Sequence, residues 1–253
     1  MSTFLKVPHL PRGRVDLLAV GENYAPLLAP ALEKRGVRVL VCPPNPDIDP
    51  RLRSHADLSV FHLGDSRFVL AAYLRGTAFS RELEALGAQL LYAERKAGPL
   101  CPADAGLCAL TVGDRLFHAP FTTDPAILRT GAFHFVPVRQ HYAKCAVCPI
   151  GEHSAMTADP GMERALRAEG IDILRLAPGG VRLAGFREGF FGGAAFLLAP
   201  DLLALTGRPD ALSGWDAASA NLAARGIRTL SLTDAPLFDI GSTILLTEQR
   251  NEL

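Results

Sequence analysis

Two cysteines with C-x-x-C spacing, Cys145 and Cys148, lie in the stretch HYAKCAVCPIGEH at residues 141–153, which has a histidine at each end. Such a pair can hold a metal, exchange a disulfide or supply a nucleophile, or it can be two small buried residues. A structural zinc site would need two further ligands, usually a second C-x-x-C or paired histidines. The chain has no second motif of this kind, because its other cysteines are scattered: Cys42, Cys101 and Cys108.

The predicted secondary structure around Cys145 narrows these alternatives. A redox pair is expected at a helix N-terminus, where the dipole lowers the thiol pKa, whereas the apolar residues here indicate a strand. Positions three apart on a strand face opposite sides, so at most one of the two thiols can face a cavity. The charge of Lys144 would favour a thiolate at Cys145 if the two side chains are close. Two interpretations stay open, a nucleophilic Cys145 or two buried core residues, and we expect no metal site.

Acidic residues precede three of the apolar segments, at Asp57, Asp104 and Asp239. Each can cap its own turn through backbone hydrogen bonds. If these segments converge, the carboxylates also form an anionic pocket for an amine, a guanidinium or a metal ion. His55 lies two positions before Asp57 and faces the same side of a strand, so it is either a structural residue or a general base tuned by the acid.

Three small residues complete the candidate set. Gly192 and Gly193 indicate a close approach of the backbone, either to a ligand or to another strand. They do not form a phosphate loop, because no lysine followed by serine or threonine comes after them. Ser242 lies in DIGSTILL, just before the last apolar run.

A repeated pattern indicates how the chain positions these residues. A helix-like segment, a glycine and a short apolar run recur five times, as LEKRGVRVLV, LEALGAQLLY, ILRTGAFHFV, LRAEGIDILRL and LAARGIRTLSL. Each glycine is expected to end its helix in the left-handed conformation, which glycine adopts without steric cost. These glycines are Gly36, Gly87, Gly131, Gly170 and Gly226.

Paired apolar runs precede most of these helices and are typical of β-hairpins. The predicted turns are Gly64-Asp65, Gly113-Asp114, Gly151-Glu152 and Pro200-Asp201. The pairs Asp124-Pro125 and Asp159-Pro160 combine an N-cap with proline at the first helical position. The unit is therefore strand, turn, strand, helix, glycine, strand.

The first unit, VDLLAVGENYAPLLAPALEKRGVRVLV, lacks its leading strand, and the spare C-terminal run FDIGSTILLTE can supply it. This predicts an α/β ring of five pseudosymmetric units, closed by the C-terminal strand, which removes an exposed sheet edge. An open doubly wound sheet is the alternative. It is disfavoured because GENYAP lacks the G-x-G-x-x-G of a Rossmann turn and because hairpins recur through the chain.

A ring of such units resembles the pentein fold of guanidino-group-modifying enzymes. The segments HADLSVFHLG, VRQHYAKCAVC, GFREGFFGGA and PLFDIGSTILL resemble those of an uncharacterised bacterial family of that fold, and the likeness runs from about Arg14 to Leu246. The resemblance implies one pentein-like domain over residues 1–253 and a nucleophilic cysteine, a histidine and guanidinium-binding carboxylates. The sequence departs from the pattern at the expected C-terminal cysteine, where Ser242 and Thr243 stand instead.

Composition excludes several other classes of function. The formal net charge is zero, so no basic surplus is available to bind nucleic acid. No apolar run approaches the ~18 residues of a membrane helix, and five cysteines in 253 residues do not suggest a disulfide framework. We therefore expect a cytoplasmic protein with reduced thiols, no cofactor, and no nucleic-acid or membrane partner.

These observations predict an enzyme acting at a C–N bond of a small polar or cationic molecule, such as a guanidino compound or an amine, in a cavity on the ring axis. Cys145 and His55 are the expected catalytic residues. The expected binding residues are Asp57, Asp104, Lys144, Gly192, Gly193, Asp239 and Ser242. The alternative function is that of a non-catalytic binding protein with the same fold.

Overall fold

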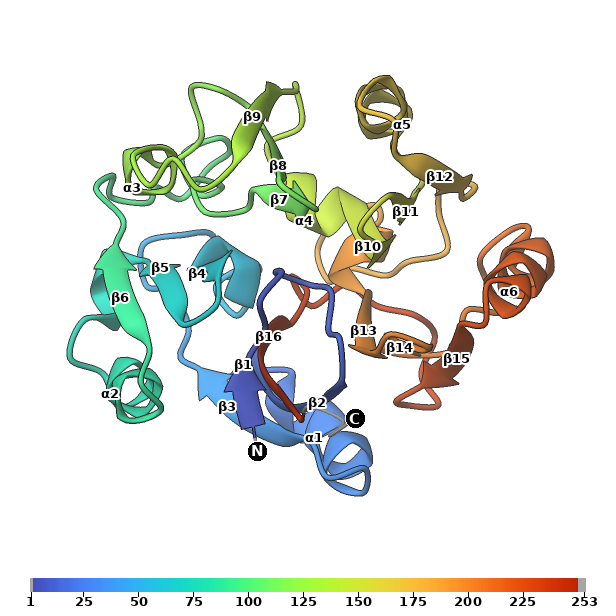
Figure 1. The fold of residues 1–253 in the computed structure, drawn as a ribbon, viewed down its shortest axis with the longest axis horizontal. Coiled ribbons are helices and arrows are strands. Elements are labelled where there is room, and N and C mark those ends of the chain that lie inside the picture. Colours follow the sequence, from blue (N-terminus) through green and yellow to red (C-terminus); the bar gives the residue numbers. More distant parts are fainter. Residues whose placement is uncertain (1, 250–253) are drawn as a thin grey trace.

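The strands of the protein form five small sheets around a central axis in the computed structural model, which describes residues 2–249 (Figure 1). In each sheet an inner strand pairs antiparallel with a middle strand, and the middle strand pairs parallel with an outer strand. A helix on the periphery connects the middle strand to the outer one. The predicted five-unit α/β ring is confirmed.

The elements of the first three units are, in chain order, β1 (Ser2–Phe4), β2 (Arg14–Gly21), α1 (Ala25–Glu33), β3 (Arg38–Cys42), η1 (Ala56–Leu58), β4 (Val60–Gly64), β5 (Arg67–Leu70), η2 (Ala72–Leu74), α2 (Ala78–Ala85), β6 (Gln89–Tyr92), β7 (Leu110–Val112), β8 (Arg115–His118), α3 (Pro125–Leu128) and β9 (His134–Pro137). The remaining elements are α4 (Ala143–Ala146), β10 (Val147–Gly151), β11 (Ser154–Thr157), α5 (Pro160–Ala168), β12 (Asp172–Arg175), η3 (Phe191–Gly193), β13 (Ala195–Ala199), β14 (Leu202–Leu205), α6 (Trp215–Ala224), β15 (Arg228–Ser231) and β16 (Ile244–Gln249). Within residues 2–249, no helix has the length and apolar character needed to cross a bilayer.

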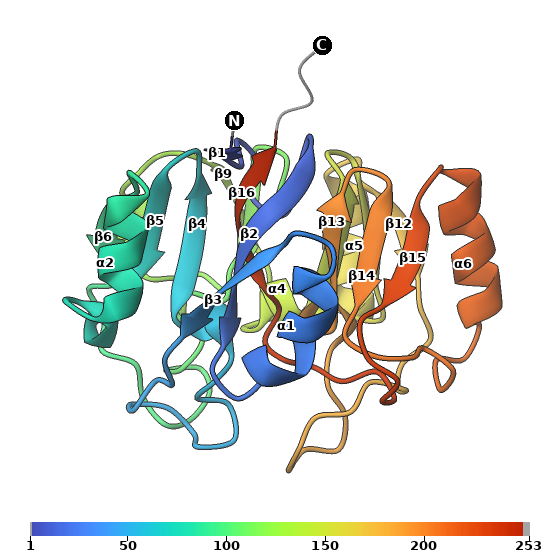
Figure 2. The same cartoon turned by 90° about the horizontal axis from the view of Figure 1, so that it is seen from below.

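The C-terminal strand closes the ring as predicted. Strand β16 pairs antiparallel with β2, with Ile244 opposite Ala19, and so serves as the inner strand of the first unit. The short strand β1 pairs with the other edge of β16, which the sequence did not indicate. Strand β1 and the end of β16 therefore lie on one face of the ring, and the long connections between units gather on the opposite face (Figure 2).

Local sequence signals account for the repeated unit. The five glycines that follow the helices all have positive φ, between 59° and 92°. A Cβ at any of them would meet nothing within 4 Å, so only the backbone conformation requires glycine there. Asp124 and Asp159 each accept backbone hydrogen bonds at the start of a helix whose first residue is proline, as predicted.

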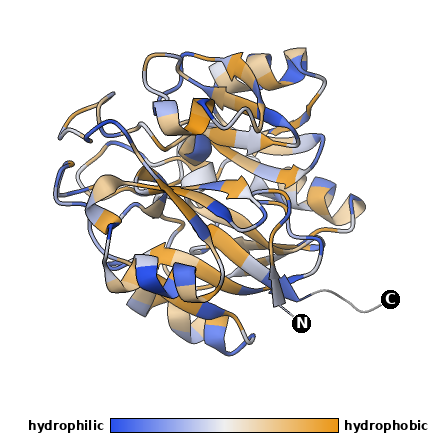
Figure 3. Ribbon diagram, turned by 60° about the vertical axis from the view of Figure 1, so that its left-hand side comes forward, coloured by the Kyte–Doolittle hydropathy of each residue, from blue (hydrophilic) through white to orange (hydrophobic). Residues whose placement is uncertain are grey.

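The hydrophobic core is divided among neighbouring units. Within the described residues, five apolar clusters each join two adjacent units, and a sixth lies over the axis. In Figure 3 the hydrophobic colours concentrate on the strands and the hydrophilic ones on helices and connections. Because burial occurs between units, each unit needs both neighbours to complete its core.

The turns that enter the inner strands differ from the prediction. Cys145 lies in the one-turn helix α4 rather than on a strand, and β10 begins only at Val147. His55 and Asp57 likewise belong to the cap and body of η1, ahead of β4. Each turn is closed by local backbone hydrogen bonds, from Ala146 to Tyr142 and from Leu58 to His55. The strand rule for which side chains face inward therefore does not apply to them.

The axis should tolerate less added volume than the periphery. A Cβ on Gly193 would overlap Asp239 Oδ1 and displace a carboxylate that accepts two backbone hydrogen bonds. We expect Gly193→Ala to lower the free energy of unfolding by about 4 kcal/mol, because overpacking adds to the lost hydrogen bonds. The control Gly87→Ala introduces left-handed strain alone and should cost about 1 kcal/mol. Equal decreases in the free energy of unfolding of the two variants, measured in urea, would contradict close packing at the axis.

Two buried histidines should make the fold sensitive to acid. Burial lowers the pKa of His62 and of His118 from 6.5 to about 4. Both groups therefore contribute stability that is present above pH 6.5 and lost as the pH falls through about 4. Urea unfolding should show this loss in the native chain and a flatter profile in the double variant His62→Gln/His118→Gln. The exposed His153→Gln should leave the profile unchanged, and a parallel slope in the double variant would refute the assignment.

Candidate active site on the ring axis

Backbone contacts bring the turns of neighbouring units together at the axis. The amide of Asp57 donates to Gly241 O at 3.2 Å, that of Lys144 to Cys108 O at 3.1 Å, and that of Ser242 to Gly193 O at 3.1 Å. A Cβ on Gly192 would overlap the carbonyl of Val147. Of the two roles considered for the glycine pair, the geometry shows backbone packing.

Four side chains from three units meet there and form what we call the thiol–carboxylate cluster: His55, Asp57, Cys108 and Cys145. The Cys145 thiol donates to Asp57 Oδ2 at 2.7 Å, and Cys108 Sγ lies 3.3 Å from the same oxygen. The two sulfur atoms are 3.9 Å apart. Ligand atoms of His55, Asp57 and Cys145 lie within 4.8 Å of one another. None of the four residues is more than 3% exposed.

Cys108 is the member of the cluster that the sequence analysis missed. The sequence predicts Asp104, not Cys108, as the contribution of the third unit to the axis. A usable signal was present, since Cys108 lies two residues before the inner strand β7 just as Cys145 lies two residues before β10. Comparing equivalent positions of the units would have paired the two thiols.

Hydrogen bonding and burial disfavour ionisation of the Cys145 thiol. The pKa of Cys145 is raised well above its ordinary value by its hydrogen bond with Cys108, by burial and by the Asp57 charge. Burial also raises the pKa of Asp57, although His55 and the Cys145 hydrogen bond oppose this. The expected thiolate is therefore not favoured in the free protein, and Cys145 is a thiol that donates to a carboxylate.

Lys144 does not act on Cys145 in the way the sequence suggested. Its buried ammonium donates to Ser242 Oγ at 2.7 Å and to Gly192 O at 3.3 Å. Ser242 has a φ of 60°, a conformation that is strained for a residue other than glycine. The lysine thus links the fourth unit to the turn that closes the ring.

The second cysteine of the C-x-x-C pair is a core residue. Cys148 Sγ contacts Ala195 O at 3.4 Å, between β10 and β13. It belongs to the apolar cluster between the fourth and fifth units, and burial raises its pKa to about 12. Only Cys145 of the pair reaches the axis, as expected, although the reason is the helix–strand junction rather than strand alternation.

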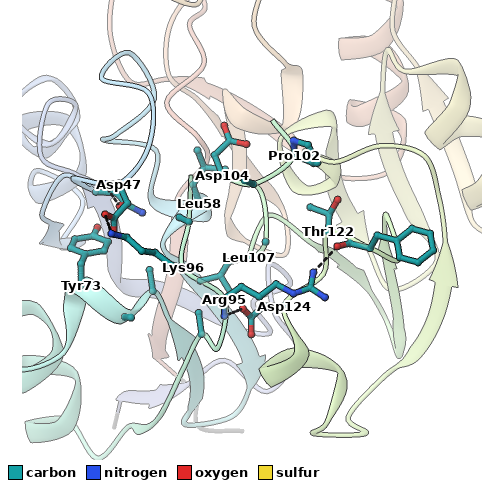
Figure 4. A pocket seen from close by; sticks show the side chains of 18 residues that line it. Asp47, Leu58, Tyr73, Arg95, Lys96, Pro102, Asp104, Leu107, Thr122 and Asp124 are labelled. Carbon is teal, nitrogen blue, oxygen red and sulfur yellow. Dashed lines mark hydrogen bonds and ion pairs between the residues drawn. The ribbon is translucent and has the colours of Figure 1, made fainter. Parts of the chain in front are cut away.

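The predicted carboxylates do not share one described cavity. Asp239 accepts from the amides of Phe190 and Gly241 at 2.9 and 2.8 Å, which is the capping role considered for it. Asp104 accepts from Tyr142 Oη at 2.8 Å and lines a cavity of about 290 Å³ between the second and third units. Figure 4 shows this cavity with Asp104 on one side and the Lys96–Asp47 pair on another.

A different cavity approaches the cluster. Tyr24, Phe238 and Asp239 are among the residues that line a space of about 610 Å³ beside the axis. Tyr24 Oη lies 3.4 Å from His55 Nε2, so this tyrosine stands between the cavity and the cluster. Burial, followed by the charges of Asp239 and Cys145, raises the Tyr24 pKa to about 12. Apolar side chains cover the thiols from the connections between units: Ile48, Leu52, Leu58 and Ala105.

Comparisons with known proteins support the architecture. A family model described as "Family of unknown function (DUF6873)" matches residues 19–244. No curated protein sequence gives a significant match.

Solved structures with a similar fold share little sequence with this chain. Inosamine-phosphate amidinotransferase from Streptomyces griseus has a TM-score of 0.60 at 14% identity, with 98% of each chain covered. An amidinotransferase of the saxitoxin pathway from Microseira wollei has a TM-score of 0.56 at 11% identity, covering 97% of this chain and 98% of that one. Agmatine deiminase from C. jejuni has a TM-score of 0.52 at 10% identity, with 90% of each chain covered. The likeness shows the fold, and the predicted pentein architecture is confirmed.

Burial of the cluster predicts the order in which thiols react. Among the described cysteines, Cys101 is exposed and the other four are buried. We expect one fast-reacting thiol in the native protein and five in urea, and Cys101→Ser should remove the fast phase. Peptide mapping after a short alkylation identifies the residue. Fast labelling of Cys145 in the native Cys101→Ser variant would show that the axis is open to solvent.

Proposed function

We propose that this chain, which belongs to the family of unknown function DUF6873, binds a small cationic guanidino compound or amine on the ring axis. The reaction that we propose is cleavage of a C–N bond of this ligand, or transfer of a group from that bond, through Cys145. The observation that carries the proposal is the 2.7 Å hydrogen bond from the Cys145 thiol to Asp57 Oδ2, with His55 beside it. A thiol bonded to a proton acceptor, with an imidazole nearby, supplies the parts needed for nucleophilic attack.

The proposed reaction begins with proton transfer from Cys145 Sγ to Asp57. The sulfur electron pair then forms an S–C bond with the planar guanidinium carbon, and one C–N bond breaks. The leaving nitrogen keeps the electron pair of the broken bond. It takes up a proton from Asp57 or His55 and departs as ammonia or an amine. Water or a second amine then attacks the amidino carbon, breaks the S–C bond and restores the thiol. With water the reaction is a hydrolysis, and with an amine it is an amidino transfer.

A cation suits the charges around the nucleophile. The charges of Asp57 and Asp239 act on each other, since Asp239 contributes to the raised pKa of Asp57. A guanidinium beside Asp57 would be held by charge-assisted hydrogen bonds to this carboxylate, would be attracted by the charge of Asp239 and would favour the thiolate. The similar structures named amidinotransferase and agmatine deiminase are consistent with this class of ligand. Entry requires the Tyr24 side of the axis to open, because the cluster is covered.

Binding without chemistry is the second candidate function. It is favoured by the raised pKa of Cys145 and by Ser242, which stands near the chain end with its hydroxyl bound to Lys144. In that case the ring retains a cationic ligand and the thiol stays intact.

Substrate turnover separates these functions. Purified protein would be incubated with arginine, agmatine and related guanidines, with and without an amine acceptor, and products identified by mass spectrometry. We expect turnover that Cys145→Ala abolishes and that Asp57→Asn reduces at least about 100-fold, the usual size of a lost proton-transfer partner. The control Cys148→Ala should keep the activity, because Cys148 faces the core.

Two results would overturn catalysis through Cys145. The first is turnover that survives in Cys145→Ala. The second is thermal stabilisation by these cations with neither product nor a covalent adduct on the intact protein, which would establish the binding function instead.

A further inference from the structure

We propose that the thiol–carboxylate cluster is a Zn²⁺ site in which Cys108 and Cys145 supply two sulfur ligands, Asp57 an oxygen and His55 a ring nitrogen. The sequence alone predicts no metal site, because the C-x-x-C pair has no second motif and the other cysteines are scattered along the chain. The structure changes the ligand set. Cys148 lies in the core, away from the cluster, and Cys108 from the third unit lies beside Cys145.

The sulfur geometry fits a tetrahedral zinc ion. Zinc–sulfur bonds of about 2.3 Å at a tetrahedral angle place two thiolate sulfurs about 3.8 Å apart. Cys108 Sγ and Cys145 Sγ are 3.9 Å apart. A sulfur–oxygen edge of such a site is about 3.5 Å, and Cys108 Sγ lies 3.3 Å from Asp57 Oδ2. Two of the edges are therefore already near their metal-bound lengths.

The edge between Cys145 and Asp57 is held short by a proton. Cys145 Sγ and Asp57 Oδ2 are 2.7 Å apart because the thiol donates to the carboxylate. Replacing that proton with zinc would lengthen the contact by less than about 1 Å. The ligand atoms of His55, Asp57 and Cys145 already lie within 4.8 Å of one another. Cys108 is outside that group and approaches the site from Asp57 and Cys145, so the imidazole and the Cys108 sulfur would have to move toward each other when the ion binds.

An unpartnered oxygen gives independent support. Asp57 is only 1% exposed, and its Oδ1 atom has no hydrogen-bond partner. A buried carboxylate oxygen without a donor is costly, and a cation in the cluster would compensate for it. Asp57 can bind such an ion through either oxygen.

Charge balance also favours a divalent ion. The buried ammonium of Lys144 lies close enough to act on Asp57 and offsets its charge. Zinc would replace one proton on each thiol, so two positive charges enter as two protons leave. The net charge of the buried cluster is therefore the same with and without the ion.

The ligand types select the metal. Two thiolates, an imidazole and one carboxylate match zinc and similar borderline ions, whereas Mg²⁺ and Ca²⁺ require oxygen ligands. Tyr24 Oη, 3.4 Å from His55 Nε2, can orient the imidazole from outside and lies on the cavity through which an ion would enter. The ligands come from three units, so the ion would tie them together across the axis.

This inference is independent of the proposed function, although the two share residues. A zinc ion on Cys145 would occupy the sulfur electron pair needed for attack on a guanidinium. The metal-bound protein would then be inactive, and removal of zinc by a chelator would restore any turnover. Zinc binding is measured without a substrate, so either proposal can fail alone.

The test uses metal-free full-length protein and added metal salts. Zinc should bind at one ion per chain by calorimetry and raise the melting temperature. Cobalt(II) should give a thiolate-to-metal charge-transfer band. X-ray absorption at the zinc edge of the native chain should count two sulfur ligands. No saturable binding, or a spectrum with fewer than two sulfurs, would overturn the site.

Matched cysteine variants assign the ligands. Cys108→Ser and Cys145→Ser should each weaken zinc binding at least tenfold and reduce the cobalt band. Cys148→Ser, which alters the C-x-x-C motif but not the cluster, should leave both unchanged. Near-ultraviolet circular dichroism checks that each variant is folded, and the sulfur count on the native chain decides the question if one is not. Loss of the band in Cys148→Ser with retention in Cys108→Ser would show a C-x-x-C knuckle instead.

Discussion

The close approach of backbone turns at the ring axis is the constraint on which the rest of the structure depends. Five units that bury apolar surface mainly against their neighbours must meet in the middle, and three positions there have no room even for a Cβ atom. Gly192, Gly193 and Gly241 let carbonyls and side chains of adjacent units come into contact. The backbone hydrogen bonds between these turns then fix which side chains point inward.

Closure by β16 makes that meeting point possible. The last strand supplies the inner position of the first unit and brings Gly241 and Ser242 against η1 and η3. Lys144 adds a side-chain link by bonding Ser242 from the fourth unit. The arrangement places a buried ammonium, a carboxylate and two thiols in one small volume. Such a cluster of ionisable groups is costly to bury without a role, which is why both proposals concern it.

The two proposals make different uses of one physical feature, a thiol hydrogen-bonded to a buried carboxylate. In the first, a cationic substrate draws the proton from Cys145 and the sulfur attacks carbon. In the second, a metal ion takes the place of that proton and of the one on Cys108. Both need a positive charge at the cluster, because the pKa of each thiol is raised in the free protein. In both, the cation would enter from the side of Tyr24. Under both proposals, the chemistry of the cluster is governed by which cation reaches the axis.

The sequence by itself determined the repeating unit, the hairpin turns, the helix-ending glycines and ring closure, because these rest on local backbone preferences and on one missing strand. It also placed Cys145, His55 and Asp57 on the axis. Tertiary structure alone decided that Lys144 turns to Ser242 and that Asp104 lines a separate cavity. It also brought Cys108 beside Cys145, which the equivalent positions of the two residues before β7 and β10 indicate once the units are aligned. The inner strands β4, β10 and β13 follow one-turn helices whose side-chain directions do not follow strand alternation. Side-chain contacts between units distant in sequence depend on how the units pack, which local backbone preferences do not specify.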